Sequence, residues 1–318
     1  MKLQVRVQQI VQETPEVRSF LLVPTDGNAL PAFSAGAHID VHLPGGLVRQ
    51  YSLCNGPKDT QGYVIAVKRE PASRGGSAAL HDHVKEGDLL QIGAPRQQFS
   101  LQMNAAHHVL IGAGIGITPL LSMARHLVEA GASFEVHYFA RSRELAPFRQ
   151  ALDQPEYAGK VQLHLGLGSD AVHATLHRLL GQRPANADLY LCGPRPFMAS
   201  VRASAHQAWP LTAVHFEYFS ADEAVLAAPQ HSFVIRLGRS GGEYEVPADQ
   251  TIVQVLGMHG IEIFTSCEQG VCGSCVTAVL DGTPDHRDSF LTDDEKQCGS
   301  KLMPCVSRAH SNVLVLDL

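Results

Sequence analysis

The sequence contains no long run of apolar residues. No window approaches the roughly 18 consecutive apolar residues that a membrane-spanning helix needs. The first residues, Met-Lys-Leu-Gln, open an alternation typical of a strand and do not resemble a signal peptide. We therefore expect a soluble, cytoplasmic protein with neither a membrane nor a nucleic acid as partner.

Cysteine is scarce and its number is odd. The 318 residues include seven cysteines, and an odd count in a long chain without a secretory signal argues against a disulfide framework. Four of them follow the pattern C-x4-C-x2-C and then a distant C: Cys267, Cys272, Cys275 and Cys305. This is the plant-type arrangement that holds a [2Fe–2S] cluster through four thiolates.

The loop that joins the first three of these cysteines contains Gly270 and Gly273. Three thiolates so close in sequence reach two irons only if the chain coils tightly, and glycine supplies backbone freedom where a Cβ would crowd the cluster. A zinc ribbon is the alternative, although such sites favour two C-x2-C pairs and this chain has one. Cys298 competes with Cys305 for the place of the fourth ligand.

The length predicts two or three domains, and the charge is divided unevenly between them. The chain has 25 basic and 31 acidic residues, a net charge of −6, and the segment from Gln230 onward has 6 basic and 12 acidic residues, again −6. An acidic face steers a basic partner during encounter, while a merely solvated surface is the alternative. We place the predicted acidic surface on Asp285, Asp288, Asp293, Asp294 and Glu295.

Helical periodicity is scarce in the first hundred residues. Leu3, Val5 and Val7 alternate with polar residues, and three similar runs follow, separated by clusters of turn residues. This pattern predicts a small antiparallel β-barrel over residues 1–102.

Two stretches of the predicted barrel carry chemically useful side chains. The first stretch is Arg49-Gln50-Tyr51-Ser52. The guanidinium of Arg49 can bind a phosphate through two parallel hydrogen bonds, Tyr51 provides a flat aromatic ring, and Ser52 provides a hydroxyl. The second stretch, Arg74-Gly75-Gly76-Ser77, precedes a helix-like run, where free backbone N–H groups bind anions. An ordinary loop with a helix cap is the alternative. Arg49-Gln50-Tyr51-Ser52 resembles the R-x-Y-S flavin signature of the ferredoxin-reductase superfamily, and this resemblance implies the candidate flavin-binding residues Arg49, Tyr51, Ser52, Lys68, Gly75, Gly76, Ser77 and Phe219.

A strand, a glycine turn and a helix follow one another from residue 108. The turn contains Gly112, Gly114 and Gly116, with Thr118 as the expected N-cap of a helix that runs to Glu129. This order is typical of a pyrophosphate site. The third glycine of the full G-x-G-x-x-G fingerprint is missing, which argues against an ordinary dehydrogenase.

Strands and helices continue to alternate, which predicts a parallel, doubly wound domain over residues 103–220. The resemblance of its glycine turn to the G-x-G-I-x-P-type turn of the ferredoxin-reductase superfamily implies that this domain binds a nicotinamide dinucleotide. The expected elements are strands at 134–140, 161–165 and 189–192 and helices at 144–152 and 172–180. Cys192-Gly193-Pro194 ends the last of these strands, where ligands lie in such sheets. Arg141 follows the strand at 134–140, and the run His215-Phe216-Glu217-Tyr218-Phe219 closes the domain.

The rest of the chain separates into a linker and a small third domain. Residues 221–231 are rich in alanine, contain Pro229 and show little periodicity, so we predict a linker. Residues 232–318 then show two hairpin strands, a helix, the cysteine loop and further strands, an order similar to the β-grasp fold of plant-type ferredoxins.

Taken together, the chain resembles the reductase components of two-component Rieske oxygenases, in the ferredoxin-reductase superfamily. The resemblance rests on R-x-Y-S, the G-x-G-I-x-P-type turn, C-G-P-x-x-M and the cysteine spacing. It implies FMN as the flavin and NADH as the donor, with Ser52 and Cys192 near the reacting atoms. It further implies that Phe219, or Tyr218 in its place, covers the flavin ring. Because M-P-C-V-S-R resembles the family's closing segment, Cys305 is preferred over Cys298.

The chemistry of these parts predicts an electron relay. NADH gives up two electrons together as a hydride, whereas a [2Fe–2S] cluster takes one at a time, so a flavin is required between them. No general base is needed. The histidines, among them His81, His83, His107 and His108, show no metal-binding pattern such as H-E-x-x-H and are expected to be solvated or to cap helices.

Several alternatives remain open at this stage. Arg141, Ser142 and Arg143 are cations and a hydroxyl that suit the extra phosphate of NADPH. The terminal acceptor is predicted to be a Rieske oxygenase that acts on aromatic compounds, with a cytochrome P450 as the alternative acceptor. A non-catalytic iron–sulfur carrier is the third reading. We expect the reductase to be a monomer.

Overall fold

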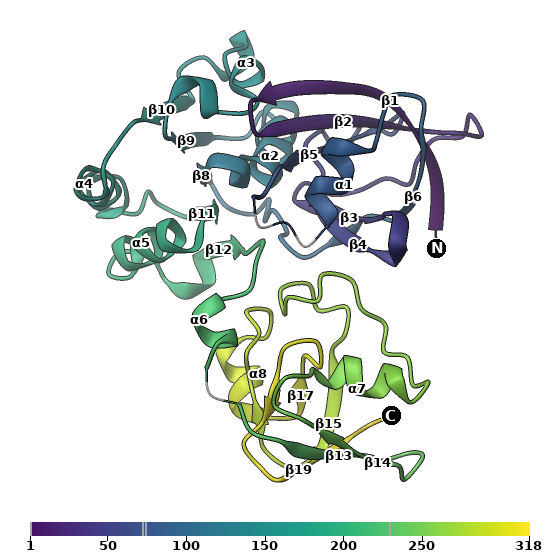
Figure 1. The fold of residues 1–318 in the computed structure, drawn as a ribbon. Helices are drawn as coiled ribbons and strands as arrows, with labels where there is room; N and C mark the ends of the chain where they lie inside the picture. The colour runs from purple at the N-terminus through teal and green to yellow at the C-terminus, as the bar shows by residue number, and fades with distance from the viewer. Residues whose placement is uncertain (1, 72, 74, 229) are drawn as a thin grey trace. The chain divides into compact units, whose positions relative to one another are not determined.

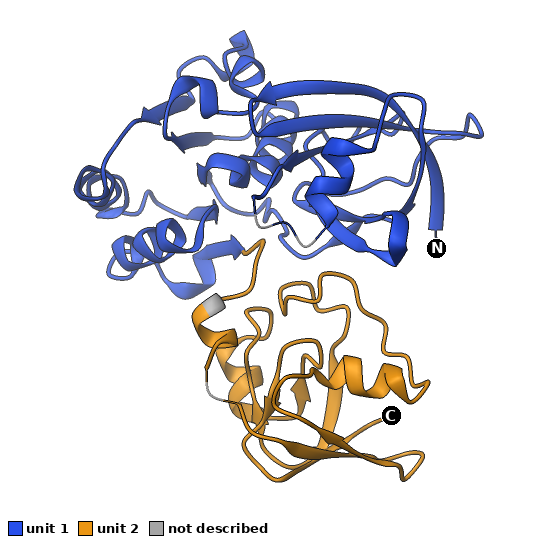
Figure 2. Cartoon of the chain, viewed as in Figure 1, with its two compact units in different colours: residues 1–217 blue, residues 218–318 orange. Residues whose placement is uncertain are grey.

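The computed structural model describes residues 2–71, 73, 75–228 and 230–318, so Arg74 and Pro229 lie outside the described residues. The chain divides into two compact units, residues 1–217 and residues 218–318, called unit 1 and unit 2 below (Figure 2). Residues 218–231, which were predicted to end the nicotinamide domain and form the linker, are grouped with unit 2.

The first part of unit 1 is an antiparallel barrel, as predicted (Figure 1). Its strands are β1 (Lys2–Thr14), β2 (Val17–Pro24), β3 (Ala37–His42), β4 (Val48–Ser52), β5 (Tyr63–Lys68), β6 (Leu89–Gly93) and β7 (Arg96–Gln97). They pair in the order β4-β3-β6-β1-β2-β5, with β7 added to β3. A bridge between Leu53 and Ile65 joins the two ends of this order and closes the barrel.

Alternation of apolar and polar side chains builds the barrel. In β1, Val5 and Val7 are fully buried while their neighbours are exposed. They pack with Phe20, Ile39 and other apolar side chains inside the barrel. Each fully buried side chain of this size contributes about 1.5–3 kcal/mol, so the interior stabilises the barrel without any cofactor. Helix α1 (Gly76–Asp82) follows β5 and packs Leu80 into this core, and η1 (Pro44–Gly46) connects β3 and β4.

The second part of unit 1 is a parallel sheet in the order β10-β9-β8-β11-β12. Its strands are β8 (His107–Ala113), β9 (Phe134–Ala140), β10 (Val161–Leu165), β11 (Ala187–Cys192) and β12 (Val214–Glu217). The connections contain η2 (Gly114–Gly116), α2 (Ile117–Glu129), η3 (Arg143–Leu145), α3 (Arg149–Leu152), η4 (Pro155–Tyr157), α4 (Ser169–Leu180), α5 (Arg195–Ala205) and η5 (Leu211–Ala213). The strand order reverses between β8 and β11, which is where ligands bind in such sheets.

Two local predictions in this sheet are wrong. The helix expected at 144–152 is interrupted, because Pro147 lacks an N–H and Phe148 adopts a left-handed φ of 59°. Thr118 is also not the N-cap of α2. That position belongs to Gly116, and the Thr118 hydroxyl donates to the main-chain oxygen of Ile115 at 2.9 Å.

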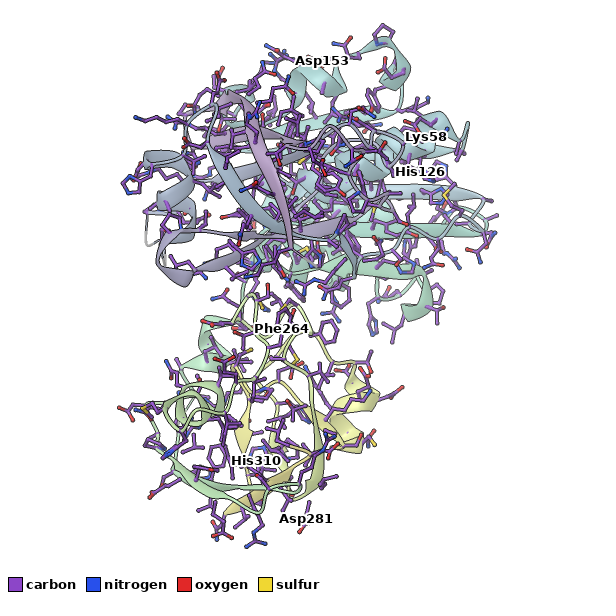
Figure 3. The ribbon with its side chains drawn as sticks, turned by 90° about the vertical axis from the view of Figure 1, so that its right-hand side faces the viewer. Lys58, His126, Asp153, Phe264, Asp281 and His310 are labelled. Carbon is purple, nitrogen blue, oxygen red and sulfur yellow. The ribbon has the colours of Figure 1, made fainter. Side chains whose placement is uncertain are left out.

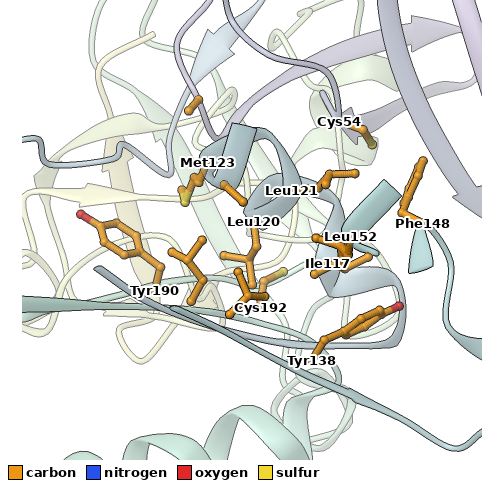
Figure 4. Close-up of a cluster of buried hydrophobic side chains, with 14 of the residues drawn as sticks. Cys54, Ile117, Leu120, Leu121, Met123, Tyr138, Phe148, Leu152, Tyr190 and Cys192 are labelled. Carbon is orange, nitrogen blue, oxygen red and sulfur yellow. The ribbon is translucent and has the colours of Figure 1, made fainter. Parts of the chain in front are cut away.

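The barrel and the parallel sheet share a core (Figure 4). Cys54 and Phe99 come from the barrel side and pack in one cluster with Leu120 and Leu121 of α2. The buried hydroxyl of Ser122 adds a 2.8 Å hydrogen bond to the main-chain oxygen of Asn55. This shared core explains why the first 217 residues form a single compact unit.

Unit 2 contains a five-stranded sheet in the order β14-β13-β19-β15-β17. Its elements are α6 (Glu223–Leu226), β13 (Phe233–Leu237), β14 (Glu243–Val246), α7 (Ile252–Met258), β15 (Thr277–Asp281), β16 (Pro284–Asp285), α8 (Asp293–Cys298), β17 (Lys301–Leu302), β18 (Arg308–Ala309) and β19 (Val313–Leu316). The parallel pair β13–β19 lies at the centre of an otherwise antiparallel sheet, which confirms the predicted β-grasp arrangement. Among the described residues, no helix combines the length and the apolar character that crossing a membrane requires.

Candidate functional site

The four predicted cluster ligands lie together in unit 2, on loops outside its strands. Cys267, Cys272, Cys275 and Cys305 are all at most 7% exposed. The Sγ atoms of Cys275 and Cys305 are 3.3 Å apart, and the thiols of Cys267 and Cys272 are hydrogen-bonded to each other. Cys298 is exposed at the end of α8, with its Sγ 3.4 Å from the Ser300 hydroxyl, and is not part of this group.

Two glycines allow the loop to coil around these thiols. Gly270 and Gly273 have left-handed φ values of 64° and 71°. A Cβ at Gly270 would lie 2.5 Å from the side chain of Val306, and one at Gly273 would lie 2.3 Å from the ring of Phe290. Only glycine fits at either position, for reasons of space as well as backbone conformation.

The two pairs of thiols divide the proton between their members. Within each pair the shared hydrogen bond lowers the pKa of one thiol, Cys272 or Cys275, and raises that of its partner, Cys267 or Cys305. The main-chain N–H of Gln269 donates to the Sγ of Cys267 at 3.3 Å. Thiolates are the form of cysteine that binds metals, so each pair already holds one side chain in the required state.

The arrangement fits a two-iron cluster. Throughout the described part of the chain, no group of three or more His, Cys, Asp or Glu side chains is arranged to hold a single metal ion. The four thiols instead form two pairs, as a cluster with two irons and four protein thiolates requires.

The candidate flavin-binding residues of β4 lie beside the start of α1. A Cβ at Gly76 would lie 2.4 Å from Cγ of Arg49, so the Arg49 side chain passes directly over the first turn of this helix. Gly75 precedes the helix with a left-handed φ of 88°. The structure therefore brings together the cation and the glycine loop that were predicted to hold a phosphate.

Other candidates on this side of the barrel already have partners. Lys68 forms a 3.0 Å ion pair with Glu70. The Ser77 hydroxyl donates to Ser73 Oγ at 3.0 Å and accepts from the Glu70 N–H at 3.2 Å. A phosphate held by these groups would replace existing contacts. Tyr51 is partly buried, and desolvation raises the pKa of its phenol.

The glycine turn after β8 packs against the C-G-P turn after β11. Gly112 and Cys192 are paired in the sheet register. A Cβ at Gly116 would lie 2.2 Å from the main-chain oxygen of Cys192, and one at Gly193 would lie 3.0 Å from Cβ of Ala113. The two predicted nicotinamide turns, including Gly114 and Pro194, therefore form one surface at the carboxyl ends of β8 and β11.

A third residue, Glu217, joins Ser52 to Cys192. The Ser52 hydroxyl lies 3.5 Å from Oε2 of Glu217, a long hydrogen bond, and Glu217 pairs with Cys192 in the register of β12 and β11. Although part of the side chain reaches solvent, the carboxyl is surrounded by protein, and this desolvation raises its pKa to about 8. Burial, with a smaller effect of Glu217, raises the pKa of Cys192 as well.

Sequence reasoning assigned no role to Glu217. Its position at the carboxyl end of the last strand of the parallel sheet, beside the C-G-P turn, is the signal that would have identified it. Phe219, by contrast, was singled out and belongs to unit 2, where it is 41% exposed. Arg141 is exposed immediately after β9.

The prediction for the histidines holds for His83, which is exposed at the C-cap of α1, and is wrong for His81 and His108, which are buried. His108 is 1% exposed, and its Nε2 lies 3.0 Å from the main-chain oxygen of Gln102. His81 is also buried, with Nε2 2.8 Å from the main-chain oxygen of Val67. Both are structural residues of unit 1.

Three of the five residues of the predicted acidic surface make contacts within unit 2. The Asp288 side chain is fully buried and accepts hydrogen bonds from the N–H groups of Phe290 and Leu291. Asp285 pairs with Arg287 at 2.7 Å, and Glu295 forms a capping box at the start of α8. Of the five residues, Asp293 and Asp294 are the exposed ones.

An exposed aromatic ring precedes the cysteine loop. Phe264 is 67% exposed and lies three residues before Cys267. It is at the opposite end of unit 2 from Asp281 (Figure 3).

The chain is similar in sequence and in structure to known reductases and to one family of iron–sulfur domains. Residues 235–310 match the family model described as the 2Fe-2S iron-sulfur cluster binding domain. A vanillate O-demethylase oxidoreductase from a Pseudomonas species is 46% identical over 95% of this chain and 96% of its own. The solved structure of phthalate dioxygenase reductase, a modular protein for electron transfer from pyridine nucleotides to [2Fe–2S], matches with a TM-score of 0.79 and 40% identity over 100% of this chain and 98% of that one. An intact type IV self-sufficient cytochrome P450 monooxygenase matches all of this chain with 41% of its own, at a TM-score of 0.85 and 34% identity.

Proposed function

This chain belongs to the family of oxygenase reductases that contains vanillate O-demethylase oxidoreductase and phthalate dioxygenase reductase, and on that premise we propose that it passes electrons from NADH through FMN and a [2Fe–2S] cluster to a terminal Rieske-type oxygenase. The observation that carries the proposal is the pair of sites described above. Ser52, Cys192 and Glu217 meet in unit 1, and four buried thiols meet in unit 2.

The nicotinamide dinucleotide binds along the two packed turns. The N–H groups of Gly114 and Gly116 and the N-terminus of α2, a helix of 13 residues, hold its pyrophosphate. Thr118 supports this turn through its hydrogen bond to Ile115. Gly193 and Pro194 then allow the nicotinamide ring to approach the edge of the sheet beside Cys192. Arg141 lies after β9, on the side of the adenosine ribose.

The flavin occupies the face of the barrel near β4. Arg49 and the N–H groups at Gly75 and Gly76 hold its phosphate, and Tyr51 packs against its ring. Lys68 and Ser77 can contact the phosphate only after they give up their present contacts with Glu70 and Ser73. When bound, the flavin supplies the step that neither neighbour can perform, since it takes two electrons from the nicotinamide and passes them on singly.

Glu217 controls charge and protons beside the reacting atoms. With a pKa of about 8, its carboxyl carries a proton at neutral pH. It therefore places no negative charge beside Ser52 and Cys192, and it can hydrogen-bond with Ser52 Oγ as donor or acceptor. On the family resemblance, Phe219 would be the aromatic residue that covers the flavin ring, with Tyr218 as the alternative.

Cys267, Cys272, Cys275 and Cys305 hold the cluster, which is the exit point for single electrons. Asp293, Asp294 and Phe264 offer exposed charge and apolar area on the same unit. The reductase acts as a cytoplasmic monomer that meets its oxygenase transiently.

One experiment tests the relay as a whole. The purified protein is mixed anaerobically with NADH or NADPH while flavin absorbance is followed in a stopped-flow instrument, and the cluster is observed by electron paramagnetic resonance. We expect rapid flavin bleaching with NADH, slower bleaching with NADPH, a one-electron-reduced cluster and extraction of FMN. A colourless protein, or one that contains zinc, would disprove the proposal.

A second candidate partner is a cytochrome P450. The match to a self-sufficient P450 monooxygenase supports it, because there a similar reductase region is part of the same chain as the P450. Reduction of a purified Rieske oxygenase at a much higher rate than of a P450 haem domain would support the first partner, and the reverse order the second.

A further inference from the structure

Tyr138 of β9 connects two loops of unit 1. Its side chain is fully buried in the core that the barrel and the parallel sheet share (Figure 4). Its hydroxyl lies 3.1 Å from the main-chain oxygen of Gly114, in the glycine turn after β8, and 3.3 Å from that of Pro147, in the loop after β9. Burial raises the pKa of this phenol, so it keeps its proton and remains a donor. One proton faces two acceptors, and the phenol therefore holds both oxygens close to one point.

The contact with Gly114 fixes the direction of the glycine turn. Gly114 has a left-handed φ of 54°, and its oxygen accepts a second hydrogen bond from the N–H of Ile117 at the start of α2. The peptide bond between Gly114 and Ile115 is trans. In a planar trans peptide the C=O and the following N–H point in opposite directions. Because the Gly114 oxygen is turned toward the buried phenol, the N–H of Ile115 is turned away from the core.

The contact with Pro147 reaches a loop that the barrel holds in place. The next residue, Phe148, adopts a left-handed φ of 59°, which is uncommon for a residue other than glycine. Its N–H donates to Oε2 of Glu13 in β1 at 3.3 Å, and its ring is buried in the shared core. Such a backbone conformation persists only where the surrounding structure holds it. Glu13 and the core therefore fix the loop against which the Tyr138 hydroxyl is set.

We propose that Tyr138 is a positioning residue for the nicotinamide dinucleotide. The inference rests on the proposed function, in which the pyrophosphate binds along the glycine turn. By holding the Gly114 oxygen, the Tyr138 hydroxyl directs the Ile115 N–H toward the pyrophosphate. Glu13 supports this arrangement from the barrel, because it fixes the loop at Pro147 and Phe148.

Loss of the hydroxyl should weaken binding and leave the chemical step unchanged. The turn would be free to rotate its Gly114–Ile115 peptide, whereas Ser52 and Cys192 beside the reacting atoms would keep their places. One net hydrogen bond corresponds to about a two- to tenfold change in a dissociation constant. The dissociation constant of NADH should rise by about this factor, and the rate of flavin reduction at saturating NADH should stay the same.

The main test compares two tyrosine variants of the full-length holoprotein. Tyr138→Phe removes the hydroxyl and keeps the ring. Tyr190→Phe is the matched control, because Tyr190 is also fully buried in the shared core and its hydroxyl accepts a 2.8 Å hydrogen bond from the main-chain N–H of Gln102. Flavin reduction is followed by stopped flow over a range of NADH concentrations. The inhibition constant of ADP-ribose, which contains the pyrophosphate but no nicotinamide, is measured in competition with NADH.

A second pair of variants tests the support from the barrel. Glu13→Leu removes the acceptor of the Phe148 N–H, whereas Glu13→Gln keeps an oxygen acceptor at the same position. The same two constants are measured. Glu13→Leu should weaken the binding of both ligands by a smaller factor than Tyr138→Phe, and Glu13→Gln should restore the affinities of the wild type.

We expect the constants for NADH and ADP-ribose to rise together in Tyr138→Phe and to stay at their wild-type values in Tyr190→Phe. Unchanged constants in Tyr138→Phe, an equal rise in Tyr190→Phe, or a fall in the saturating rate without a change in affinity overturns the proposal. Should Tyr138→Phe yield no folded protein, wild-type constants in Glu13→Leu overturn it.

Failure of this inference differs from failure of the proposed function. If the proposed function fails, NADH does not reduce the flavin of the wild type. If only the role of Tyr138 fails, NADH reduces the wild type and Tyr138→Phe with the same affinity.

Discussion

The two units hold their binding residues in different ways. In unit 1, Ser52, Cys192 and Glu217 stand at the ends of strands, and Cys192 is itself part of a large buried core. In unit 2, the four cysteines lie on loops, and Cys275 and Cys305 are part of a small buried cluster. The comparison teaches that the site proposed for unit 1 is fixed by strands and an extensive core, whereas the thiols of unit 2 are fixed by loops, so the geometry of unit 2 should be the more sensitive to loss of the group that these thiols would hold.

Removal of a cluster ligand should give the largest effect. Cys305→Ser takes one thiolate from a buried pair, so the cluster should be lost and NADH-driven reduction of cytochrome c abolished. Reduction of ferricyanide at the flavin should persist, because unit 1 is complete by itself. The measurements are the iron content and the rates at which cytochrome c and ferricyanide are reduced. Cys298→Ser, at an exposed cysteine, is the control, and loss of both activities in Cys305→Ser would contradict the independence of the two units.

Gly116→Ala, which adds one methyl group, should impair the two nicotinamide turns of unit 1 almost as strongly as Cys305→Ser impairs the cluster site. Its Cβ would lie 2.2 Å from the Cys192 oxygen, so the two nicotinamide turns must separate. We expect slow flavin reduction by NADH and a loss of about 1–3 kcal/mol in the free energy of unfolding of unit 1. The unfolding is followed by the fluorescence of Trp209, the single tryptophan. Gly168→Ala, where a Cβ would meet nothing within 4 Å, should leave flavin reduction unchanged and, because Gly168 is the N-cap of α4, should lower the free energy of unfolding by no more than about 1 kcal/mol.

Glu217 should make the stability of unit 1 depend on pH. Its pKa is raised to about 8 in the folded state from 4.5, so the folded unit binds this proton more tightly than the unfolded chain. The stabilisation is complete below the unfolded value and is lost as the pH rises through about 8. Urea unfolding at pH 6 and pH 9, followed by Trp209, should show a smaller decline in Glu217→Gln than in the wild type. A decline as steep as that of the wild type would contradict the assignment, and Glu156→Gln at an exposed site is the control.

The smallest effect is expected at the surface of unit 2. Asp293→Asn with Asp294→Asn should slow electron transfer to the oxygenase about twofold at low salt, and the difference should vanish at high salt, because exposed charges are screened. Rates at several ionic strengths measure it. The control is Asp281→Asn, because Asp281 lies at the other end of unit 2 from Phe264 (Figure 3). This substitution should not change the rate of electron transfer. An equal effect at Asp281 would show that only net charge matters.

Much of the architecture was predictable because its signals are local. The alternation around Val5 and Val7 predicts a barrel strand, and the spacing of Cys267, Cys272 and Cys275 with Gly270 and Gly273 predicts a tight cluster loop. The interruption of the helix expected at 144–152 has a local cause as well, since Pro147 cannot donate the required hydrogen bond. The apolar periodicity of residues 144–152 favours a helix, but a proline inside the segment is the stronger signal.

The sequence by itself determined the chemical character of this protein: which thiols are present, how they are spaced, and which strands and turns carry Ser52 and Cys192. These properties depend on residues that are near neighbours in the chain. Only the tertiary structure decided that Glu217 meets Ser52, 165 residues away, that Asp288 is buried, and that Gln269 binds the segment at Ala221. Such contacts arise from the packing of whole elements, and packing is set by shape and burial across the entire unit, which no local pattern specifies.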